Sequence, residues 1–544
     1  MSKQIISGFE AIKKLEAGVK KLTSAVKITL GPKGRKVVLD RKFATPLITN
    51  DGVTIAKEIS LPDPYENMGA NLIKEVSIRT NEIAGDGTTT ACILAESIVS
   101  EGIKNYTAGA NPVILRKGIQ KGIEVATNHL KEISIPVSST KEIFQVASIS
   151  AGDEEIGKLI AEGFEKVGRD GVITVEESKT LKTELKIVEG MQFDRGYLSP
   201  YMITNTDKME CLLNDAYILI TDKKIKNLGD IIGVLEAVSQ SGKGLLIIAE
   251  DIENEVLSTL VLNKLRGALN VVAVKAPAYA DKRKALCEDI AVLTNGTFIC
   301  DELGFELKDT DISKLGYATN IKVTKDSTTI SGGAGTHEAI QCRVNEIKGQ
   351  IDTCDNEFDR NRLQERLAKL IGGIAVIYVG SATEVEMQEK KLRIEDAIEA
   401  TKSATQEGIV CGGGIALINC VESVEKLAQT LSGDEKTGAE IVLKSLYAPI
   451  KMITQNAGID GGVVINNILQ NKSNNYGYNA LTNEYVDMIE QGIIDPTKVT
   501  RSALENAGSV ASTLLTTEVL VCDIEDKINT KDPNAVPNAY GMYN

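Results

Sequence analysis

Apolar residues recur at helical spacing through both outer parts of the chain. The first such run predicts an amphipathic helix over residues 9–28. Its apolar positions are Ile12, Leu15, Val19, Leu22 and Val26. The same spacing predicts helices over 70–80, 91–99, 154–167 and 500–517.

The middle of the chain, from Gly190 to about Gly373, has a different pattern. Short apolar strands alternate there with helical segments, which argues for an α/β layer. The strands are predicted over 217–221, 245–249 and 271–274, and the helices over 228–240 and 252–265.

Both of these helices carry more apolar residues than one buried stripe needs. In 252–265 the apolar positions are Val256, Leu257, Leu260, Val261, Leu262 and Leu265. Such a helix is either buried on all sides or presents a second apolar face to a partner. The pattern leaves both interpretations open, and burial is the commoner outcome.

Glycine, proline and asparagine interrupt the periodic segments and predict turns. We expect a hairpin-like piece within 44–60, turning at 50–52, and further turns at 476–479 and 495–496. The tail from Lys527 to Asn544 is rich in Asn, Pro and Lys and is predicted to be disordered.

Length and composition narrow the class of protein. A chain of 544 residues is long enough for about three domains. The net charge of -14 argues against nucleic acid as a partner. Nine scattered cysteines without a CxxC pair favour a reducing compartment. Because no signal peptide and no apolar run near the ~20 residues of a membrane span is found, we expect a cytoplasmic protein without membrane contact.

The segment Gly85 to Thr90 lies between two predicted helices and combines one carboxylate with flanking glycines and three threonines. Glycines admit a ligand close to the backbone, and the threonines supply hydroxyls and a helix N-cap at a natural anion site. Mg²⁺ bridges carboxylate to phosphate, so the segment suggests a magnesium–nucleotide site. An ordinary capped turn has the same composition.

Other segments are weaker candidates for a nucleotide site when each is taken alone. The loop 29–35 offers Thr29, Lys33 and Arg35 to a phosphate, although it is not a Walker A sequence. Asp51 lies on a predicted turn, and glycines 412–414 precede an apolar helix. Each of these features also occurs in ordinary turns and close-packed contacts.

Several stretches together resemble the group I chaperonins of bacteria and organelles, the GroEL type. The likeness runs from about residue 5 to about 524 in one order. The matching stretches are Thr29 to Arg35, Gly85 to Thr90, Glu189 to Tyr197, Ala382 to Met387 and Asp495 to Arg501.

This resemblance implies an ATP-driven protein-folding machine of two stacked seven-membered rings, which captures non-native polypeptides and takes a small ring-shaped co-chaperonin. It implies a multidomain α and α/β fold. A mostly helical equatorial domain would comprise 1–132 and 407–544, a small α/β intermediate domain 133–188 and 375–406, and an inserted α/β apical domain 189–374.

The resemblance also implies a site for ATP and Mg²⁺, with K⁺ as a further candidate cation. Asp86 would bind Mg²⁺, and Asp396 would be the catalytic carboxylate that polarises or deprotonates the attacking water, assisted by Asp51. The residues implied to bind the nucleotide are Thr29, Leu30, Gly31, Pro32, Asp86, Gly87, Thr88, Thr89, Thr90, Ile149, Ser150, Gly412, Gly413, Asn479, Ala480, Ile493 and Asp495.

For the two helices with excess apolar residues, 228–240 and 252–265, the resemblance favours an outward apolar face that binds clients and the co-chaperonin. Val256 and Leu260 would still face inward. The implied contact residues are Tyr197, Tyr201, Met202, Ile232, Leu235, Leu257, Val261 and Leu262. Asn50 departs from the family, because many relatives carry Lys there, and the tail lacks a Gly-Gly-Met repeat.

Two alternatives remain. The chain could be a ring-forming binding or scaffold paralogue with weak or no ATP turnover, although Asp51, Asp86 and Asp396 are all present. It could instead resemble the built-in-lid chaperonins, but residues 189–374 show no extra protruding segment.

Overall fold

The structure is a computed structural model that describes residues 2–40, 46–137, 139–168, 171–178, 180–206, 208–278, 281–302, 304–354, 356–371, 373–471 and 473–523. The chain divides into two compact units. We call Met1–Glu154 with Glu399–Asn544 the terminal unit, and Glu155–Ile398 the central unit. The predicted disorder of the tail, 527–544, lies outside the described residues.

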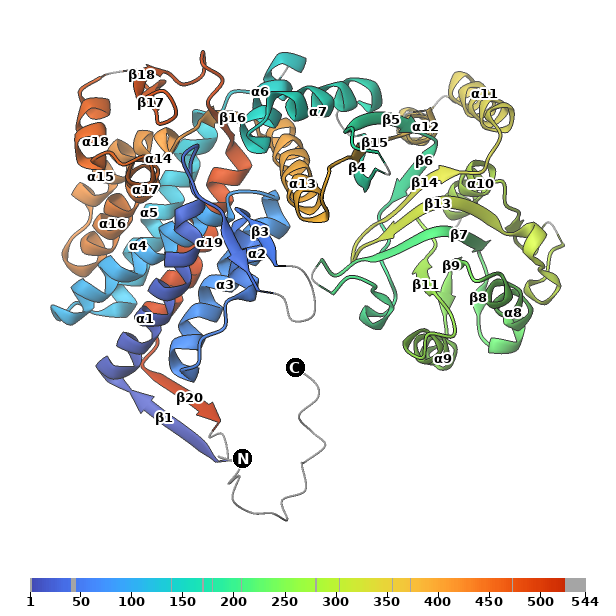
Figure 1. Cartoon of the computed structure of the whole chain (residues 1–544), viewed down its shortest axis with the longest axis horizontal. Coiled ribbons are helices and arrows are strands. Elements are labelled where there is room, and N and C mark those ends of the chain that lie inside the picture. Colours follow the sequence, from blue (N-terminus) through green and yellow to red (C-terminus); the bar gives the residue numbers. More distant parts are fainter. Residues whose placement is uncertain are drawn as a thin grey trace. The chain divides into compact units, whose positions relative to one another are not determined.

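The terminal unit is built around long helices that pack side by side (Figure 1). Helix α1 packs on α3 and α4, α19 packs on α3, α4 and α5, and α16 packs on α5. The helices are α1 (Gly8–Val26), α2 (Gly52–Glu58), α3 (Pro64–Ala84), α4 (Thr88–Thr107), α5 (Pro112–Glu132), α6 (Thr140–Ala151), α14 (Ile415–Asn419), α15 (Val421–Thr430), α16 (Gly433–Ser445), α17 (Ala448–Asn456), α18 (Gly461–Gln470) and α19 (Thr497–Leu515).

Short strand pairs join distant parts of the terminal unit. The strands are β1 (Lys3–Ser7), β2 (Val37–Leu39), β3 (Leu47–Thr49), β16 (Ile409–Cys411), β17 (Tyr476–Asn479), β18 (Glu484–Asp487), β19 (Ile494–Pro496) and β20 (Val519–Asp523). The pairs are β1 with β20, β2 with β3, β16 with β19 and β17 with β18, all antiparallel. The first pair brings the two ends of the described chain together.

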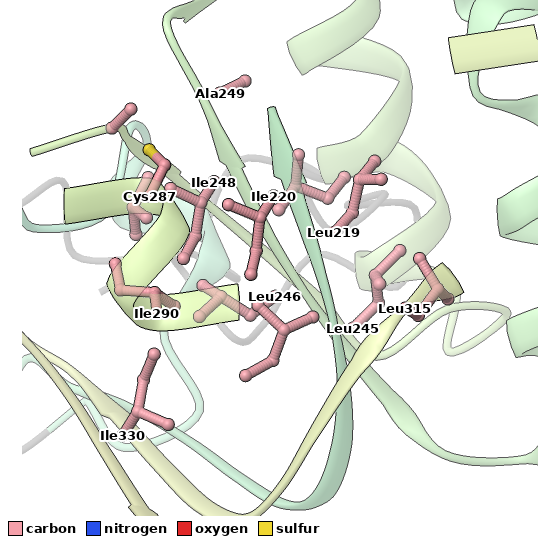
Figure 2. Close-up of a cluster of buried hydrophobic side chains, with 14 of the residues drawn as sticks. Leu219, Ile220, Leu245, Leu246, Ile248, Ala249, Cys287, Ile290, Leu315 and Ile330 are labelled. Atoms are coloured by element: carbon pink, nitrogen blue, oxygen red, sulfur yellow. The ribbon is translucent and has the colours of Figure 1, made fainter. Parts of the chain in front are cut away.

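The central unit contains a seven-stranded sheet with the order β11-β9-β7-β13-β14-β6, and β12 also pairs with β7. Its strands are β6 (Gly190–Phe193), β7 (Cys211–Thr221), β9 (Gly244–Ala249), β11 (Val271–Lys275), β12 (Phe298–Ile299), β13 (Gly316–Val323) and β14 (Thr328–Gly333). Strands β7, β9 and β11 are parallel, which confirms the predicted α/β layer. Figure 2 shows side chains from β7, β9 and α10 gathered in one aliphatic core, among them Ile220, Leu246 and Ile290.

The remaining elements of the central unit are helices and shorter strands. The helices are α7 (Glu154–Val167), α8 (Ile232–Ser241), α9 (Asn254–Leu265), α10 (Asp281–Thr294), α11 (His337–Thr353), α12 (Glu357–Ile371) and α13 (Glu384–Glu407), and α13 continues past the division at Ile398. The strands are β4 (Val172–Glu177), β5 (Glu184–Val188), β8 (Lys224–Ile225), β10 (Asp251–Ile252) and β15 (Ile374–Val379). Strand β15 lies between β4 and β5 in a second sheet.

Two pairs of chain segments run past each other side by side. Ile135 and Ile409 exchange backbone hydrogen bonds of 2.9 and 2.8 Å in the terminal unit. In the central unit, Val188 pairs with Ile374 across the second sheet. At each place an outgoing and a returning strand of the chain are held together.

The long periodic helices are found where the sequence predicts them, but several short elements are not. The segment predicted as hairpin-like contains one strand, β3, followed by helix α2, because Asp51 caps that helix instead of turning a hairpin. The predicted turns at 476–479 and 495–496 belong to strands β17 and β19. Gly87, and not a threonine, occupies the N-cap of α4.

All nine cysteines are free, as their scattered spacing indicates. Among the described residues, no helix has the length and apolar content needed to cross a bilayer.

Candidate nucleotide site and apolar surface

The N-termini of α2 and α4 meet in the terminal unit. Asp51 caps α2 by accepting hydrogen bonds from Val53 N at 3.1 Å and Thr54 N at 3.0 Å. A Cβ atom on Gly52 would lie 2.5 Å from Oγ1 of Thr89 and 2.7 Å from Oγ1 of Thr88. Only glycine therefore lets the two helix ends approach this closely. The Asp51 carboxylate already occupies the first α2 amides, so the free anion-binding amides belong to α4, whose N-cap Gly87 has no capping side chain.

The turn before α4 depends on two glycines. Gly85 and Gly87 have φ of 72° and 78°, in the left-handed region. A Cβ on Gly85 would lie 2.2 Å from Cβ of Glu399, and one on Gly87 would lie 2.5 Å from Cγ1 of Val499. The turn is thus held between helices from the distant C-terminal part of the chain.

The loop that follows α1 lies against α4 and α17. Thr29 is buried, donates to the carbonyl of Val26 at 2.9 Å, and its Oγ1 lies 3.3 Å from Oγ1 of Thr89. The Asn456 amide in α17 donates to the carbonyl oxygens of Lys27 at 3.0 Å and Leu30 at 2.9 Å. These bonds fix the path of the loop that carries Thr29 to Pro32.

Lys33 links the same loop to the hairpin β17–β18. Its Nζ donates to Oδ1 of Asn483 at 2.8 Å, and the hydroxyl of Tyr478 lies 3.3 Å from that oxygen. Asn483 has a φ of 63°, which asparagine tolerates better than most residues. In this structure Lys33 therefore braces two loops against each other.

Asp86 lies close enough to Asp51 and to Asp495 for their charges to interact. Asp86 accepts from Gly87 N at 2.5 Å and from the Ser150 hydroxyl at 3.1 Å. Burial raises the pKa of Asp86, and the nearby Asp51 charge adds to that effect. Burial, followed by the charge of Asp86, raises the pKa of Asp495 to about 7. The mutual repulsion of these groups would be relieved by a cation.

The glycine run 412–414 approaches the segment before β19. Gly412 N donates to the carbonyl of Ile493 at 2.9 Å, and Gly413 and Gly414 have φ of 65° and 82°. Asn479 ends β17 and accepts from Leu481 N at 2.9 Å. Ala480, which is buried, and Ile493 share one apolar cluster. The Gly412 bond places the glycine run beside the segment that leads to Asp495.

The predicted residues divide between the two units. The structure brings Thr29, Asp51, the 86–90 turn, Ser150 and Asp495 into one region of the terminal unit. Ile149, on the preceding position of α6, is exposed. Asp396 belongs to the central unit, where it lies in α13 next to Glu395.

The donor set fits a magnesium–nucleotide complex. The described residues hold no group of three or more His, Cys, Asp or Glu side chains able to enclose a metal by themselves. Mg²⁺ is usually held by one or two carboxylates together with waters and substrate phosphates, so an all-protein cage is not required. Asp86 supplies the matching carboxylate, and the N-terminus of α4, whose N-cap Gly87 has no capping side chain, supplies the anion-binding amides.

The apolar surface predicted on the central unit is only partly present. Tyr201, Ile232 and Leu262 are 68%, 47% and 47% exposed. Three more predicted residues are partly buried against the core: Tyr197, Leu257 and Val261. As predicted, Val256 and Leu260 face inward.

Two residues predicted on that surface are instead buried, so the prediction is wrong for both in this structure. Met202 is fully buried, and its Sδ accepts from Ala273 N at 3.4 Å. Leu235 lies in the core with Val234 and Val238. Helix α8 turns those three side chains inward and leaves Ile232 exposed.

The sequence does not reveal the roles of Gly52, Asn456 and Asn483. The contacts of Asn456 and Asn483 join segments hundreds of residues apart, and a lone Asn in an apolar helix carries no local signal. Gly52 contacts Thr88 and Thr89 on a different helix. The dipeptide Asp51-Gly52 is visible, but it is typical of a turn.

A family model for the TCP-1/cpn60 chaperonin family matches residues 22–525. The match covers nearly the whole described chain, and it includes both candidate sites. The chain therefore belongs to the TCP-1/cpn60 chaperonin family.

Proposed function

We propose that this protein is an ATP-hydrolysing chaperonin of the group I type, which captures non-native polypeptides and encloses them in a ring cavity for folding. Chaperonins of this family are ATP-dependent folding chaperones that assemble into rings. Beyond this family membership, we infer that the chaperonin is of group I, which residues form its sites, and that a domain movement precedes hydrolysis.

The convergence of the α2 and α4 N-termini on Asp86 carries the proposal. Phosphoryl transfer needs positioning and neutralisation of charge more than covalent chemistry. The free amides at the α4 N-terminus would position the phosphate and neutralise part of its charge, with Asp86 as the carboxylate that would hold Mg²⁺. When bound, Mg²⁺ supplies charge neutralisation at the phosphate oxygens.

The other residues of the terminal unit then take defined roles. Residues 87–90 and 29–32 hold phosphate oxygens and the sugar, and Ile149 and Ser150 flank them. Gly412, Gly413 and Asp495 contact the ribose, and Asn479, Ala480 and Ile493 contact the base. The hydrogen bonds of Thr29 and Asn456 support this assignment, because they hold the loop in one conformation before ligand binds.

Asp396 is assigned as the carboxylate that orients the attacking water, with Asp51 assisting. We place Asp396 in an intermediate domain, 133–188 with 375–406, between equatorial segments 1–132 and 407–544 and an apical domain, 189–374. The paired crossings at Ile135–Ile409 and Val188–Ile374 support these boundaries, because a double crossing can serve as a hinge. Hydrolysis would then wait for the closing movement of that domain.

Tyr201, Ile232 and Leu262 form the centre of the proposed client and co-chaperonin surface. Exposed aliphatic and aromatic side chains bind clients whose only common feature is exposed apolar surface. Their exposure favours this role over burial in the core.

Steady-state ATPase and refolding assays test the proposal. We expect Mg²⁺-dependent ATP hydrolysis, at least tenfold slower in Asp396→Ala, and refolding of a denatured enzyme that requires ATP and a co-chaperonin. Glu384→Ala, an exposed carboxylate on the same helix, is the control and should match the wild type.

Equal ATPase rates in Asp396→Ala and wild type would remove the catalytic assignment. A wild type without turnover would favour the scaffold alternative. Electron micrographs with eight- or nine-fold rings, or refolding that needs no co-chaperonin, would favour the built-in-lid type.

A further inference from the structure

A short turn joins the 3-10 helix Pro200–Met202 to strand β7 in the central unit. Asn205 and Glu210 close it with backbone hydrogen bonds of 2.9 and 3.1 Å. Met209 has a φ of 51°, in the left-handed region that a residue with a long side chain rarely adopts. Backbone in such a conformation persists only when surrounding contacts hold it, and it often marks a functional segment.

This turn places Lys208 against helix α13. The Lys208 ammonium donates to Oε2 of Glu395, and the two side chains are only 31% and 25% exposed. Glu210, at the base of the turn, has separate partners, because Lys322 Nζ lies 3.0 Å away and the Asn205 amide 3.3 Å away. Lys208 is therefore directed at α13, while Glu210 stabilises the turn.

The charges around Lys208 favour this contact. Burial opposes the ammonium charge, but the carboxylates of Glu395, Glu210 and Asp396 together raise the pKa of Lys208 above its ordinary value. Lys208 is thus charged at neutral pH, and its field reaches Asp396 as well as Glu395.

We propose that the Lys208–Glu395 ion pair is a latch that ties the Asp396 segment of α13 to the seven-stranded sheet and must open before Asp396 can act. The inference rests on the proposed function, because it needs Asp396 to be carried to the nucleotide by a domain movement. The turn leads directly into β7, so a movement of α13 away from the sheet would separate Lys208 from Glu395. The latch slows hydrolysis and leaves nucleotide binding unaffected.

Three variants test the latch in the full-length, assembled protein. Lys208→Met and Glu395→Gln should each raise kcat for ATP hydrolysis about two- to fivefold, the range expected on removing one partly exposed ion pair, with KM unchanged. The charge swap Lys208→Glu with Glu395→Lys should return kcat toward wild type. Lys226→Met, an exposed lysine of the same unit, is the matched control and should leave kcat unchanged.

Unchanged kcat in Lys208→Met, or a swap variant as fast as the single variants, would overturn the latch. Amide hydrogen exchange gives a second readout that does not depend on mutation. Adding ATP to the wild type should speed exchange in residues 208–211 and 392–396, and equal protection with and without ATP would also overturn it. Loss of turnover in Asp396→Ala with no effect of Lys208→Met would reject the latch alone, whereas normal turnover in Asp396→Ala would reject the proposed function.

Discussion

The hydroxyl oxygens of Thr29 and Thr89 lie 3.3 Å apart, although the residues are 60 positions apart in the chain. Thr29 ends the short 3-10 helix after α1, and Thr89 lies in the first turn of α4. Both are largely buried. This contact joins the two proposed phosphate-binding loops. Each loop therefore holds the hydrogen-bond donors of the other in place before a ligand binds.

Replacing Thr89 with valine removes that hydroxyl while keeping the branched shape. We expect the Kd for ATP to rise roughly fivefold, which corresponds to ~1 kcal/mol for one lost hydrogen bond. Titration calorimetry with a non-hydrolysed ATP analogue measures this. Thr107→Val, at the far end of the same helix, removes a hydroxyl bonded to the Ile103 carbonyl and should leave the Kd unchanged. Equal affinities for wild type and Thr89→Val would contradict the assigned role.

Asn456 is predicted to affect nucleotide binding without touching the nucleotide. Asn456→Ala frees the carbonyls of Lys27 and Leu30, so the loop loses its fixed conformation. The KM for ATP should rise about three- to tenfold, because the loss of two partly buried hydrogen bonds at about 0.5 kcal/mol each costs ~1 kcal/mol in total. The kcat at saturating ATP should change less than twofold. Asn105→Ala, whose amide bonds to the Glu101 carbonyl within α4, is the control.

The sequence predicts the long helices α1, α3, α4 and α19 of the terminal unit, because each spans several turns with a strong apolar period. It misses the short helix α2. It fails at the strands β17 and β19. Their Tyr, Gly, Asn and Pro residues are typical of turns, and they become strands only by pairing with β18 and β16. Ile409 and Pro496 pair across more than eighty positions, and local propensity contains no information on such a partner.

The candidate site is divided in the same way. The 85–90 turn is visible in the sequence because glycines and an aspartate mark it locally. The contact of Gly52 with Thr89 and the anchoring of Leu30 by Asn456 depend on helix packing, so no local pattern predicts them. The sequence shows that α8 has more apolar residues than one buried face needs. It does not show which of them face the core, because that depends on how the helix packs, and Leu235 is buried.

Gly87 should be intolerant of any side chain. Gly87→Ala combines a left-handed φ of 78° with a Cβ placed 2.5 Å from Cγ1 of Val499. We expect a loss of about 2–4 kcal/mol in the free energy of unfolding, from ~1 kcal/mol of backbone strain plus the cost of displacing Val499. Denaturant unfolding measures this loss.

Gly152→Ala is the matched control, because Gly152 also has a positive φ, of 61°, but nothing lies within 4 Å of its Cβ position. Its free energy of unfolding should fall by only ~1 kcal/mol, the contribution of backbone strain. Similar losses in both variants would show that α19 does not hold the turn as tightly as the structure indicates.

Substitution of the exposed apolar side chains of α8 and α9 should weaken client capture without changing ATP turnover. Leu262→Ser removes a half-exposed leucine from the proposed surface, so binding of a denatured test protein should weaken several-fold while ATPase stays within twofold of wild type. Leu181→Ser, in the loop between β4 and β5, removes an even more exposed leucine and should not change capture. Equal loss of capture in both variants would argue against a localised surface.

Asp495 gives a pH-dependent test of the carboxylate cluster in the ligand-free protein. Burial and then the charge of Asp86 raise the pKa of Asp495 from 3.8 to about 7. The folded chain therefore holds an extra proton between these values, so the contribution of Asp495 lowers the free energy of unfolding as the pH rises from about 4 to 7. Asp495→Asn removes this dependence. The variant should be more stable than wild type by about 1–2 kcal/mol at pH 8, after allowance for partial exposure, and nearly equal at pH 4.5.

Asp63 provides a control of opposite sign. A hydrogen bond from Lys14, opposed in part by burial, lowers the pKa of Asp63 below its ordinary value. Its stabilising contribution is therefore present above the ordinary pKa and is lost as the pH falls. Asp63→Asn should be less stable than wild type at pH 8, with the difference narrowing in acid. Denaturant unfolding at both pH values distinguishes the two carboxylates, and parallel pH profiles for the two variants would contradict the repulsion between Asp86 and Asp495.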